Sequence, residues 1–450
     1  MSITLPALSP LLKPSFIFGV ATAAFQIEGA NQLDGRIESI WDTFCATPGK
    51  VLNSDDGSVA CDHYHKWQED IELIKSLGVD AYRLSIAWPR LMDQNGDINP
   101  KGIAFYRNLL SQLKAHNIKT FVTLYHWDLP QHLEDEGGWL NRETAYKFRD
   151  YAQLAATELG PWVEVWTTFN EPWCSSILGY GEGIHAPGLK DHAKARQAGH
   201  HILLAHGLAM PVLKSICPNA LAGIVLNMSK SYPADNNPSS LMASLLAEAL
   251  DNHFFIEPIL KGSYPDIIAA LKPELMPEVK TGDMDIIQSP IDYLGLNYYT
   301  CNHASWHPEQ GIQTILKSDS EVEYTDIGWE INPHSLFELL TNLNRQYALP
   351  PIYITENGAA CDDHLIDGEV NDEQRIRYLD GHLNAIDQAI EQGVDIRGYF
   401  AWSLMDNFEW AEGYSKRFGL VHVDYQTQRR TLKASAKAYQ ALITSRASHC

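Results

Sequence analysis

Short apolar segments alternate with amphipathic ones along most of the chain. The apolar segments are rich in Val, Ile, Thr and aromatic residues, which is typical of strands that are buried on both faces. They occupy residues 16–26, 80–88, 119–127, 163–170, 221–228, 293–299, 352–355 and 396–404. We therefore predict eight β-strands.

The segments between these strands show helical spacing. In 62–77 the apolar residues recur every three or four positions, and Gly78 follows where a helix would end. Two further helices are predicted at 101–116 and 372–392, and Asn371 would cap the second. The chain thus alternates between strands and helices.

This alternation predicts an α/β fold built from parallel βα units. Eight such units close most simply into a single (β/α)8 TIM barrel, with one domain over 1–450 and a barrel core at about 16–445. A doubly wound open sheet is the alternative, but no G-x-G-x-x-G follows the first strand. The less regular stretches 229–292 and 301–332 are expected to be elongated βα loops around a pocket at the C-terminal face.

Charge narrows the classes of function. The 450 residues include 34 Lys and Arg against 56 Asp and Glu, a formal net charge of −22. Phosphates and anionic membrane surfaces attract basic patches, so we expect neither a nucleic-acid nor a membrane partner. The acidic excess is typical of a device for solubility.

The cysteines and the N-terminus bear on the compartment. The seven cysteines are widely spaced and form no C-x-x-C pair, which argues against a disulfide framework or a zinc knuckle. Residues 1–14 lack the charged and apolar regions of a secretory signal, and no run of about 18 apolar residues exists. We expect a cytoplasmic protein with free thiols.

Polar and aromatic residues gather at the ends of the predicted strands. In a barrel these ends face the active site. The residues concerned are Gln26, His126, Asn170, Glu171, Asn297, Tyr299, Glu356 and Trp402.

Two of these residues are carboxylic acids that follow apolar strands. Glu171 lies in T-F-N-E-P and Glu356 in I-T-E-N-G. Burial makes ionisation costly, and neighbouring groups can separate two pKa values. Glycoside hydrolysis needs such a pair, one carboxyl protonated and the other ionised. Taken alone, either glutamate could instead belong to a buried ion pair.

Further motifs give the chain a family resemblance. They are F-I-F-G-V-A-T-A-A-F-Q-I-E-G (16–29), C-D-H-Y-H (61–65), Y-R-L-S-I-A-W-P-R (82–90), H-A-P-G (185–188), F-E-W (408–410) and K-R-F-G-L (416–420). Together with the two glutamate segments, in this order, they resemble glycoside hydrolase family 1, the β-glucosidase family. The resemblance covers nearly the whole chain.

The resemblance implies a retaining β-glucosidase that works through a covalent glycosyl-enzyme. Glu356 would be the nucleophile and Glu171 the acid/base. Arg83, Asn297 and Tyr299 match positions that support the nucleophile. The implied substrates are β-glucosides and cello-oligosaccharides, as in cellulose and polysaccharide degradation.

The resemblance also implies substrate contacts. The aglycone side would have Trp173 and Trp329, and core packing is the alternative for both. The matched substrate-binding positions are Gln26, His126, Asn170, Trp402, Glu409, Trp410 and Phe418.

Two other functions remain as alternatives. A 6-phospho-β-glucosidase is disfavoured because the Glu409 carboxylate would repel a 6-phosphate, which binds cations and donors. A non-catalytic sugar-binding protein would have lost the catalytic carboxylates, and both are present. We expect no cofactor and no metal, since the chain has neither a phosphate loop nor H-E-x-x-H. A homo-oligomer is possible.

Overall fold

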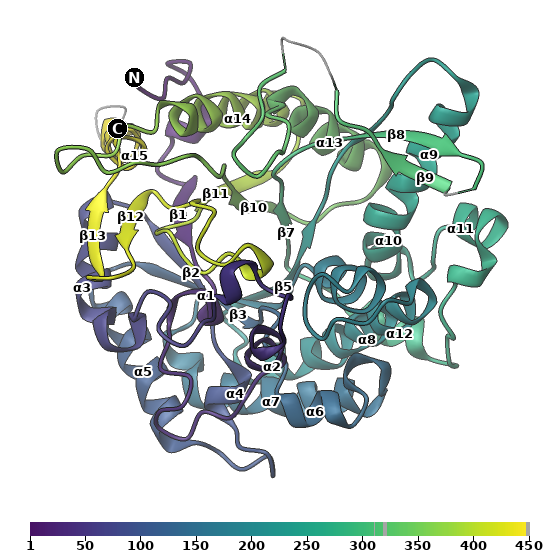
Figure 1. Cartoon of the computed structure of the whole chain (residues 1–450), viewed down its shortest axis with the longest axis horizontal. Coiled ribbons are helices and arrows are strands. Elements are labelled where there is room, and N and C mark those ends of the chain that lie inside the picture. Colours follow the sequence, from purple (N-terminus) through teal and green to yellow (C-terminus); the bar gives the residue numbers. More distant parts are fainter. Residues whose placement is uncertain (310, 318–321, 447–450) are drawn as a thin grey trace.

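Parallel strands form a closed barrel in the computed structural model, which describes residues 1–309, 311–317 and 322–446 (Figure 1). Around the barrel the strands follow the order β1-β11-β10-β7-β5-β4-β3-β2. Their bounds are β1 Ile17–Ala21, β2 Ala81–Ser85, β3 Lys119–Tyr125, β4 Val165–Asn170, β5 Leu221–Asn227, β7 Tyr293–Asn297, β10 Ile352–Asn357 and β11 Ile396–Trp402. The predicted TIM barrel is confirmed, and the open sheet is excluded.

Some predicted strand ends are wrong. The first strand stops at Ala21, which pairs with Arg83 on one side and Trp402 on the other. The chain then turns, and Gln26 lies in the short helix α1 (Ala24–Ile27) instead of a strand. The periodicity missed this turn because the residues of α1 are as buried as those of β1.

Other predicted ends also differ. Strands β3, β7 and β11 each stop two residues earlier than expected, so His126 and Tyr299 follow their strands. Strand β2 stops at Ser85, and Trp88 begins the helix α4 (Trp88–Leu91). Strand β10 runs two residues further than predicted, so Glu356 lies within the strand, paired with Asn297 of β7. This pairing is irregular, with a register shift after Ile354.

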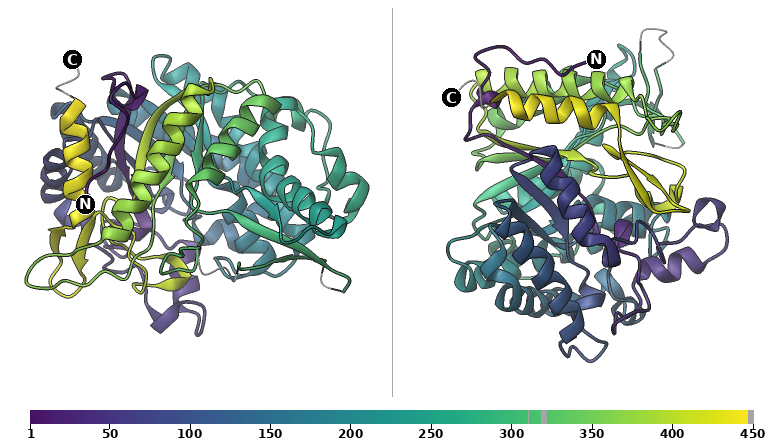
Figure 2. Two further views of the ribbon diagram at one scale, coloured as in Figure 1. Left: turned by 90° about the horizontal axis from the view of Figure 1, so that it is seen from above. Right: turned by 90° about the vertical axis from the view of Figure 1, so that its left-hand side faces the viewer.

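Helices surround the barrel. The longer ones are α3 His63–Leu77, α5 Pro100–Ala115, α7 Glu143–Leu159, α8 His192–Ile216, α13 Pro333–Gln346, α14 Glu373–Glu391 and α15 Ala434–Ser445. Shorter ones are α2 Ile40–Ala46, α6 Gln131–Asp135, α9 Pro238–Glu248, α10 Phe254–Lys261, α11 Asp266–Leu271 and α12 Asp283–Ile287. Near the termini α14 and α15 lie side by side (Figure 2).

The three predicted helices are present within about one residue of their expected ends. The helix α3 ends at Gly78, whose φ of 71° is the left-handed conformation that glycine adopts easily. The predicted cap of α14 is wrong by one residue. Asp372 occupies that position, and its carboxylate accepts a hydrogen bond from the Ser435 amide instead of capping the helix.

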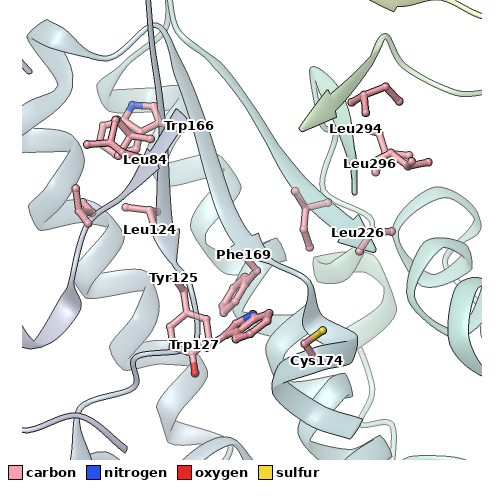
Figure 3. Packing of buried hydrophobic residues seen from close by; sticks show 14 of the residues in the cluster. Leu84, Leu124, Tyr125, Trp127, Trp166, Phe169, Cys174, Leu226, Leu294 and Leu296 are labelled. Atoms are coloured by element: carbon pink, nitrogen blue, oxygen red, sulfur yellow. The ribbon is translucent and has the colours of Figure 1, made fainter. Parts of the chain in front are cut away.

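Alternate residues of the strands face two different cores. Phe121 packs inside the barrel against Tyr353 and Phe400. Its neighbour Val122 points outward into the layer between strands and helices. Figure 3 shows members of that outer layer, among them Leu124. Because both faces of the strands are buried, the sequence reads as continuous apolar runs.

The two irregular stretches contain more regular structure than expected. Residues 229–292 hold the helices α9 to α12, and β6 (Ser231–Pro233) begins the stretch. Strand β6 pairs with β8 (Asn302–His307), which pairs with β9 (Gly311–Thr314). A two-stranded sheet of β12 (Val421–Asp424) and β13 (Arg429–Leu432) follows β11. In the described part of the chain, no helix has the length and apolar character to span a membrane.

A buried cluster of charged residues links the connection after β10 to the connection after β11. The Lys433 ammonium lies 2.5 Å from Asp363, after β10, and 2.6 Å from Asp406, after β11. Arg375 of α14 also pairs with Asp363, and Arg417 pairs with Asp406. Lys433 and both aspartates are almost fully buried, so each charge depends on its partners.

We expect Lys433→Met to lower the free energy of unfolding by about 3–5 kcal/mol, because it leaves two carboxylates buried beside fewer cations. Urea unfolding followed by tryptophan fluorescence measures the change. Lys437→Met is the matched control, since that lysine pairs with Glu369 at the surface and such pairs contribute about 0–1 kcal/mol. Equal losses in the two variants would contradict the prediction.

Candidate active site

A cavity of about 860 Å³ opens at the C-terminal ends of the barrel strands. Both glutamates singled out by the sequence, Glu171 and Glu356, face it. The other predicted residues that line it are His126, Trp173, Asn297, Tyr299, Trp329, Trp402, Glu409, Trp410 and Phe418. Three predicted residues lie behind the lining, almost fully buried: Gln26, Arg83 and Asn170.

Glu356 is held by two donors. The Arg83 guanidinium donates from Nη1 to Oε1 at 2.5 Å, and the Tyr299 hydroxyl donates to Oε2 at 2.5 Å. Arg83 comes from β2, so the ion pair crosses the barrel. A cation and a hydroxyl donor both favour the ionised form of a carboxyl. Glu356 is therefore the cavity carboxyl that is paired with a cation.

Glu171 is held differently. It follows β4 with a φ of 51°, and its amide donates to the carbonyl of Val225 in β5. Its carboxyl accepts one hydrogen bond from Asn297 Nδ2 at 2.6 Å and one from the Cys174 thiol at 3.1 Å. No Lys or Arg forms an ion pair with it among the described residues. Burial, reinforced by the negative charge of Glu356, raises the pKa of Glu171 to about 8.

Asn170 connects the two carboxyl environments. Its Oδ1 accepts from Arg83 Nη2 at 2.7 Å and from Asn297 Nδ2 at 3.0 Å. Its Nδ2 lies 3.1 Å from Nε2 of His126 and donates to it. Burial and the nearby Arg83 hold the pKa of His126 well below its usual range, so the imidazole is neutral. Its proton is then on Nδ1, which has no partner among the described residues and can donate to a ligand.

One end of the cavity is walled by Glu409, Trp402 and Trp410. Burial, and then the charges of Glu356 and Glu171, raise the pKa of Glu409 to about 8. Gln26 Nε2 donates to the Phe408 carbonyl at 2.9 Å and lies 3.5 Å from Glu409. Gln26 Oε1 is buried without a partner in the described part of the chain. This end therefore offers both acceptors and donors to a polyhydroxylated ligand.

Aromatic rings complete this end. The His126 ring stacks at 5.9 Å from Trp402 and 6.0 Å from Trp410, with interplanar angles of 17° and 16°. Trp410 rests in turn on Trp41 at 4.6 Å and Trp127 at 4.5 Å. Such flat, firmly packed faces suit the apolar side of a sugar ring.

The two predicted aglycone-side tryptophans also line the cavity. The Trp173 indole donates from Nε1 to Asp251 at 2.9 Å, and both side chains line the cavity. Trp329 packs against Tyr299 at 5.3 Å and Phe418 at 5.9 Å. Trp173 and Trp329 are both only partly buried, which leaves ring surface free for a ligand.

Sequence reasoning missed Cys174 and Asp251, which both line the cavity. Cys174 comes only three residues after Glu171, and this closeness along the chain could have indicated that it lies in the site. Asp251 belongs to the long connection after β5, whose path the periodicity does not predict.

Comparisons with known proteins identify the architecture. The sequence profile of glycosyl hydrolase family 1 matches residues 9–448. The chain belongs to glycosyl hydrolase family 1. A β-glucosidase of Agrobacterium sp. is 47% identical over 95% of this chain and 94% of its own length. β-Glucosidase A of Thermotoga maritima is 44% identical over 95% and 96%.

Solved structures of this glycosyl hydrolase family agree. The β-glucosidase from Thermotoga maritima in complex with glucoimidazole superposes with a TM-score of 0.94 and 43% identity, over 98% of this chain and all of its own. The family 1 β-glucosidase of Exiguobacterium antarcticum also gives a TM-score of 0.94 at 43% identity, over 97% and 98%. The predicted family, fold and enzyme class are thereby confirmed: this family member is a glycoside hydrolase.

We expect Cys174→Ala to raise the pKa of Glu171, because the thiol donates a hydrogen bond to its ionised form. Titration of ¹³C-labelled glutamate carboxyls by NMR would measure the shift. Cys361→Ala is the control, since that thiol is buried to a similar degree and donates to the carbonyl of Ala359. An unchanged or lowered pKa of Glu171 in the Cys174 variant would contradict this role.

Proposed function

We propose that this glycoside hydrolase is a retaining β-glucosidase that releases terminal non-reducing β-glucosyl residues by double displacement. The assignment to β-glucosidases follows from full-length relatives that carry this name at 44% and 47% identity. One contrast in the site carries the mechanism. Glu356 is held by a cation and a hydroxyl, whereas burial and a neighbouring charge raise the pKa of Glu171 to about 8.

In the first step the Glu356 carboxylate attacks the anomeric carbon of the bound sugar. The bond from that carbon to the glycosidic oxygen breaks, and Glu171 gives its proton to the departing oxygen. A covalent glycosyl-enzyme forms on Glu356 with inversion at the carbon. Because the pKa of Glu171 is raised to about 8, this carboxyl holds its proton at neutral pH and can act as the acid.

The second step follows from the same charges. When Glu356 becomes an ester, it loses the negative charge that raised the pKa of Glu171. The pKa of Glu171 then falls, and the deprotonated group takes a proton from a water molecule. The hydroxide attacks the anomeric carbon, the bond to Glu356 breaks, and a second inversion restores the configuration. Asn170, between Arg83 and His126, is the proposed partner of the sugar 2-hydroxyl.

The proposed substrates are neutral β-glucosides, including cello-oligosaccharides. A relative from Thermotoga neapolitana, 42% identical over 95% of this chain, is named a 1,4-β-D-glucan glucohydrolase. In this chain Glu409 supports the same choice, since a carboxyl beside the sugar can accept from its hydroxyls. A 6-phosphate would meet Glu409 instead of a cation, which disfavours the phosphorylated alternative.

Three wider proposals accompany this function. The cytoplasm is the proposed compartment, supported by free thiols at the six cysteines that the structure describes. Cys450 lies outside the described residues. A single domain over 1–450 and a possible homo-oligomer are retained as proposals.

Removing each carboxyl tests the mechanism. We expect Glu356→Gln to abolish turnover of every aryl β-glucoside. Glu171→Gln should lose about 10²- to 10⁴-fold with poor leaving groups and far less with dinitrophenol, which leaves without protonation. Initial rates on a series of aryl β-glucosides measure both effects.

Glu134→Gln is the control for these variants, because Glu134 is a half-buried carboxyl outside the cavity. Normal turnover by Glu356→Gln would show that Glu356 is not the nucleophile. If the loss of activity in Glu171→Gln were the same for every leaving group, Glu171 would not be the general acid. Activity on 6-phosphoglucosides alone would replace the proposed substrate class.

The raised pKa of Glu171 predicts the alkaline limit of activity. The acid must be protonated in the first step, and its pKa of about 8 lies above the ordinary value. We therefore expect kcat/KM to fall as the pH rises through about 8. Because Glu409 has a similar pKa, the profile should be repeated in Glu409→Gln, where the limit should persist at weaker binding. A limit that vanishes in Glu409→Gln would assign it to Glu409 instead.

A further inference from the structure

Three side chains with metal-binding atoms meet just behind the wall of the cavity. Cys301 directly precedes β8, and His303 is the second residue of that strand. Glu330 comes from the stretch before α13, 27 residues further along the chain. Their thiol, imidazole and carboxylate atoms all lie within 4.8 Å of one another. We refer to these residues as the Cys301 triad.

The triad is buried, but each of its residues keeps a small exposed area. Cys301 and His303 are each 5% exposed, and Glu330 is 7% exposed. His303 Nε2 lies 2.9 Å from Glu330 Oε2 and 4.0 Å from the Cys301 sulfur. Asn332 Nδ2 donates to Glu330 Oε1 at 2.9 Å and contacts the Cys301 sulfur at 3.5 Å, so a further side chain fixes two of the three.

The charge of the triad is incompletely balanced. Within the described part of the chain, the ion pair of Glu330 is with His303, and no Lys or Arg joins it. The three ligand atoms therefore meet in a buried place with no described Lys or Arg beside them, where a bound divalent cation would supply positive charge. The described residues contain no other group of three such ligands that is equally close.

We propose that the Cys301 triad is a binding site for Zn²⁺. A thiolate, an imidazole and a carboxylate together favour a borderline-soft cation over Mg²⁺ or Ca²⁺, which prefer oxygen ligands. On binding, the thiol releases its proton to solvent and forms the sulfur–zinc bond. Three protein ligands leave the fourth tetrahedral position to water.

The distances fit such a site after a small movement. Zinc bonds of about 2.0–2.3 Å imply about 3.3–3.6 Å between ligand atoms at tetrahedral angles. The sulfur and His303 Nε2 must approach by about half an ångström, and Glu330 must move slightly away from the imidazole. Cys301 and His303, two positions apart, share one face of an extended segment, so both can move inward.

The site would tie together two segments that form the aglycone wall. Thr300 and Asn302, on either side of Cys301, line the cavity, as does Trp329 beside Glu330. The Thr300 hydroxyl already donates to the Glu330 carbonyl at 2.9 Å. Zinc would add a second link between the same segments, next to Tyr299 and its hydrogen bond to Glu356. The metal would act as a structural link and take no part in the chemistry.

No motif in the chain indicated this site, and we expected no metal. The usual zinc patterns place two ligands a few residues apart in each of two groups. Here Glu330 joins the C-x-H pair only because the segment before α13 returns to the start of β8.

Cobalt titration tests the proposal directly. Chelator-treated full-length protein is titrated anaerobically with Co²⁺, whose thiolate charge-transfer absorption reports bonding to sulfur. We expect this absorption to saturate at one ion per chain, to vanish on addition of Zn²⁺, and to be absent in Cys301→Ser. Zn²⁺ should also raise the unfolding temperature of the wild type and not that of Cys301→Ser.

The controls separate the triad from other thiols. Cys361→Ser and Cys174→Ser should keep the absorption, the second because the active-site cysteine is not the ligand. His303→Gln and Glu330→Gln should weaken Zn²⁺ binding roughly tenfold or more, and they decide the question if Cys301→Ser does not fold. No thiolate absorption in the wild type, its survival in Cys301→Ser, or its loss in Cys174→Ser would overturn the proposal.

Discussion

The site depends on one constraint: two carboxyl groups share one buried cavity, and ionising both of them there costs free energy. Each negative charge disfavours the other, and burial disfavours both. The molecule resolves this by giving Glu356 the cation of Arg83 and the hydroxyl of Tyr299, while Glu171 receives only the weaker donors Asn297 and Cys174. This asymmetry of donors distinguishes the two carboxyls and supports their proposed roles.

The barrel makes this asymmetry possible. Arg83 and Glu356 lie on β2 and β10, which are not neighbours, so only a closed sheet brings them together. Asn170 and Asn297 end β4 and β7 and join the two carboxyl environments. These residues lie on strands that are hydrogen-bonded to a neighbouring strand on each side. Their positions are therefore fixed, and little rearrangement is needed when charge develops during the reaction.

The sequence predicted much of this, for identifiable reasons. Strands buried on both faces produce apolar runs, so all eight were found, and polar residues at their ends marked Glu171 and Glu356. The run through Gln26 failed as a strand because buried helices and strands look alike over a few residues. Asp251 and Glu330 were not predicted because they lie on long connections, whose paths the periodicity does not determine. The family resemblance supplied what periodicity cannot, namely the division of labour between the two glutamates.

The separation between strands and connections has a consequence for how such an enzyme can diverge. Glu356 and its donor Arg83 lie on barrel strands, whereas Trp173, Asp251 and Trp329 lie on segments that follow the strands. Insertions in those segments can reshape the entrance without moving the ion pair between Glu356 and Arg83, which joins two barrel strands. Selection can therefore alter which leaving groups are accepted while the reaction itself is inherited unchanged.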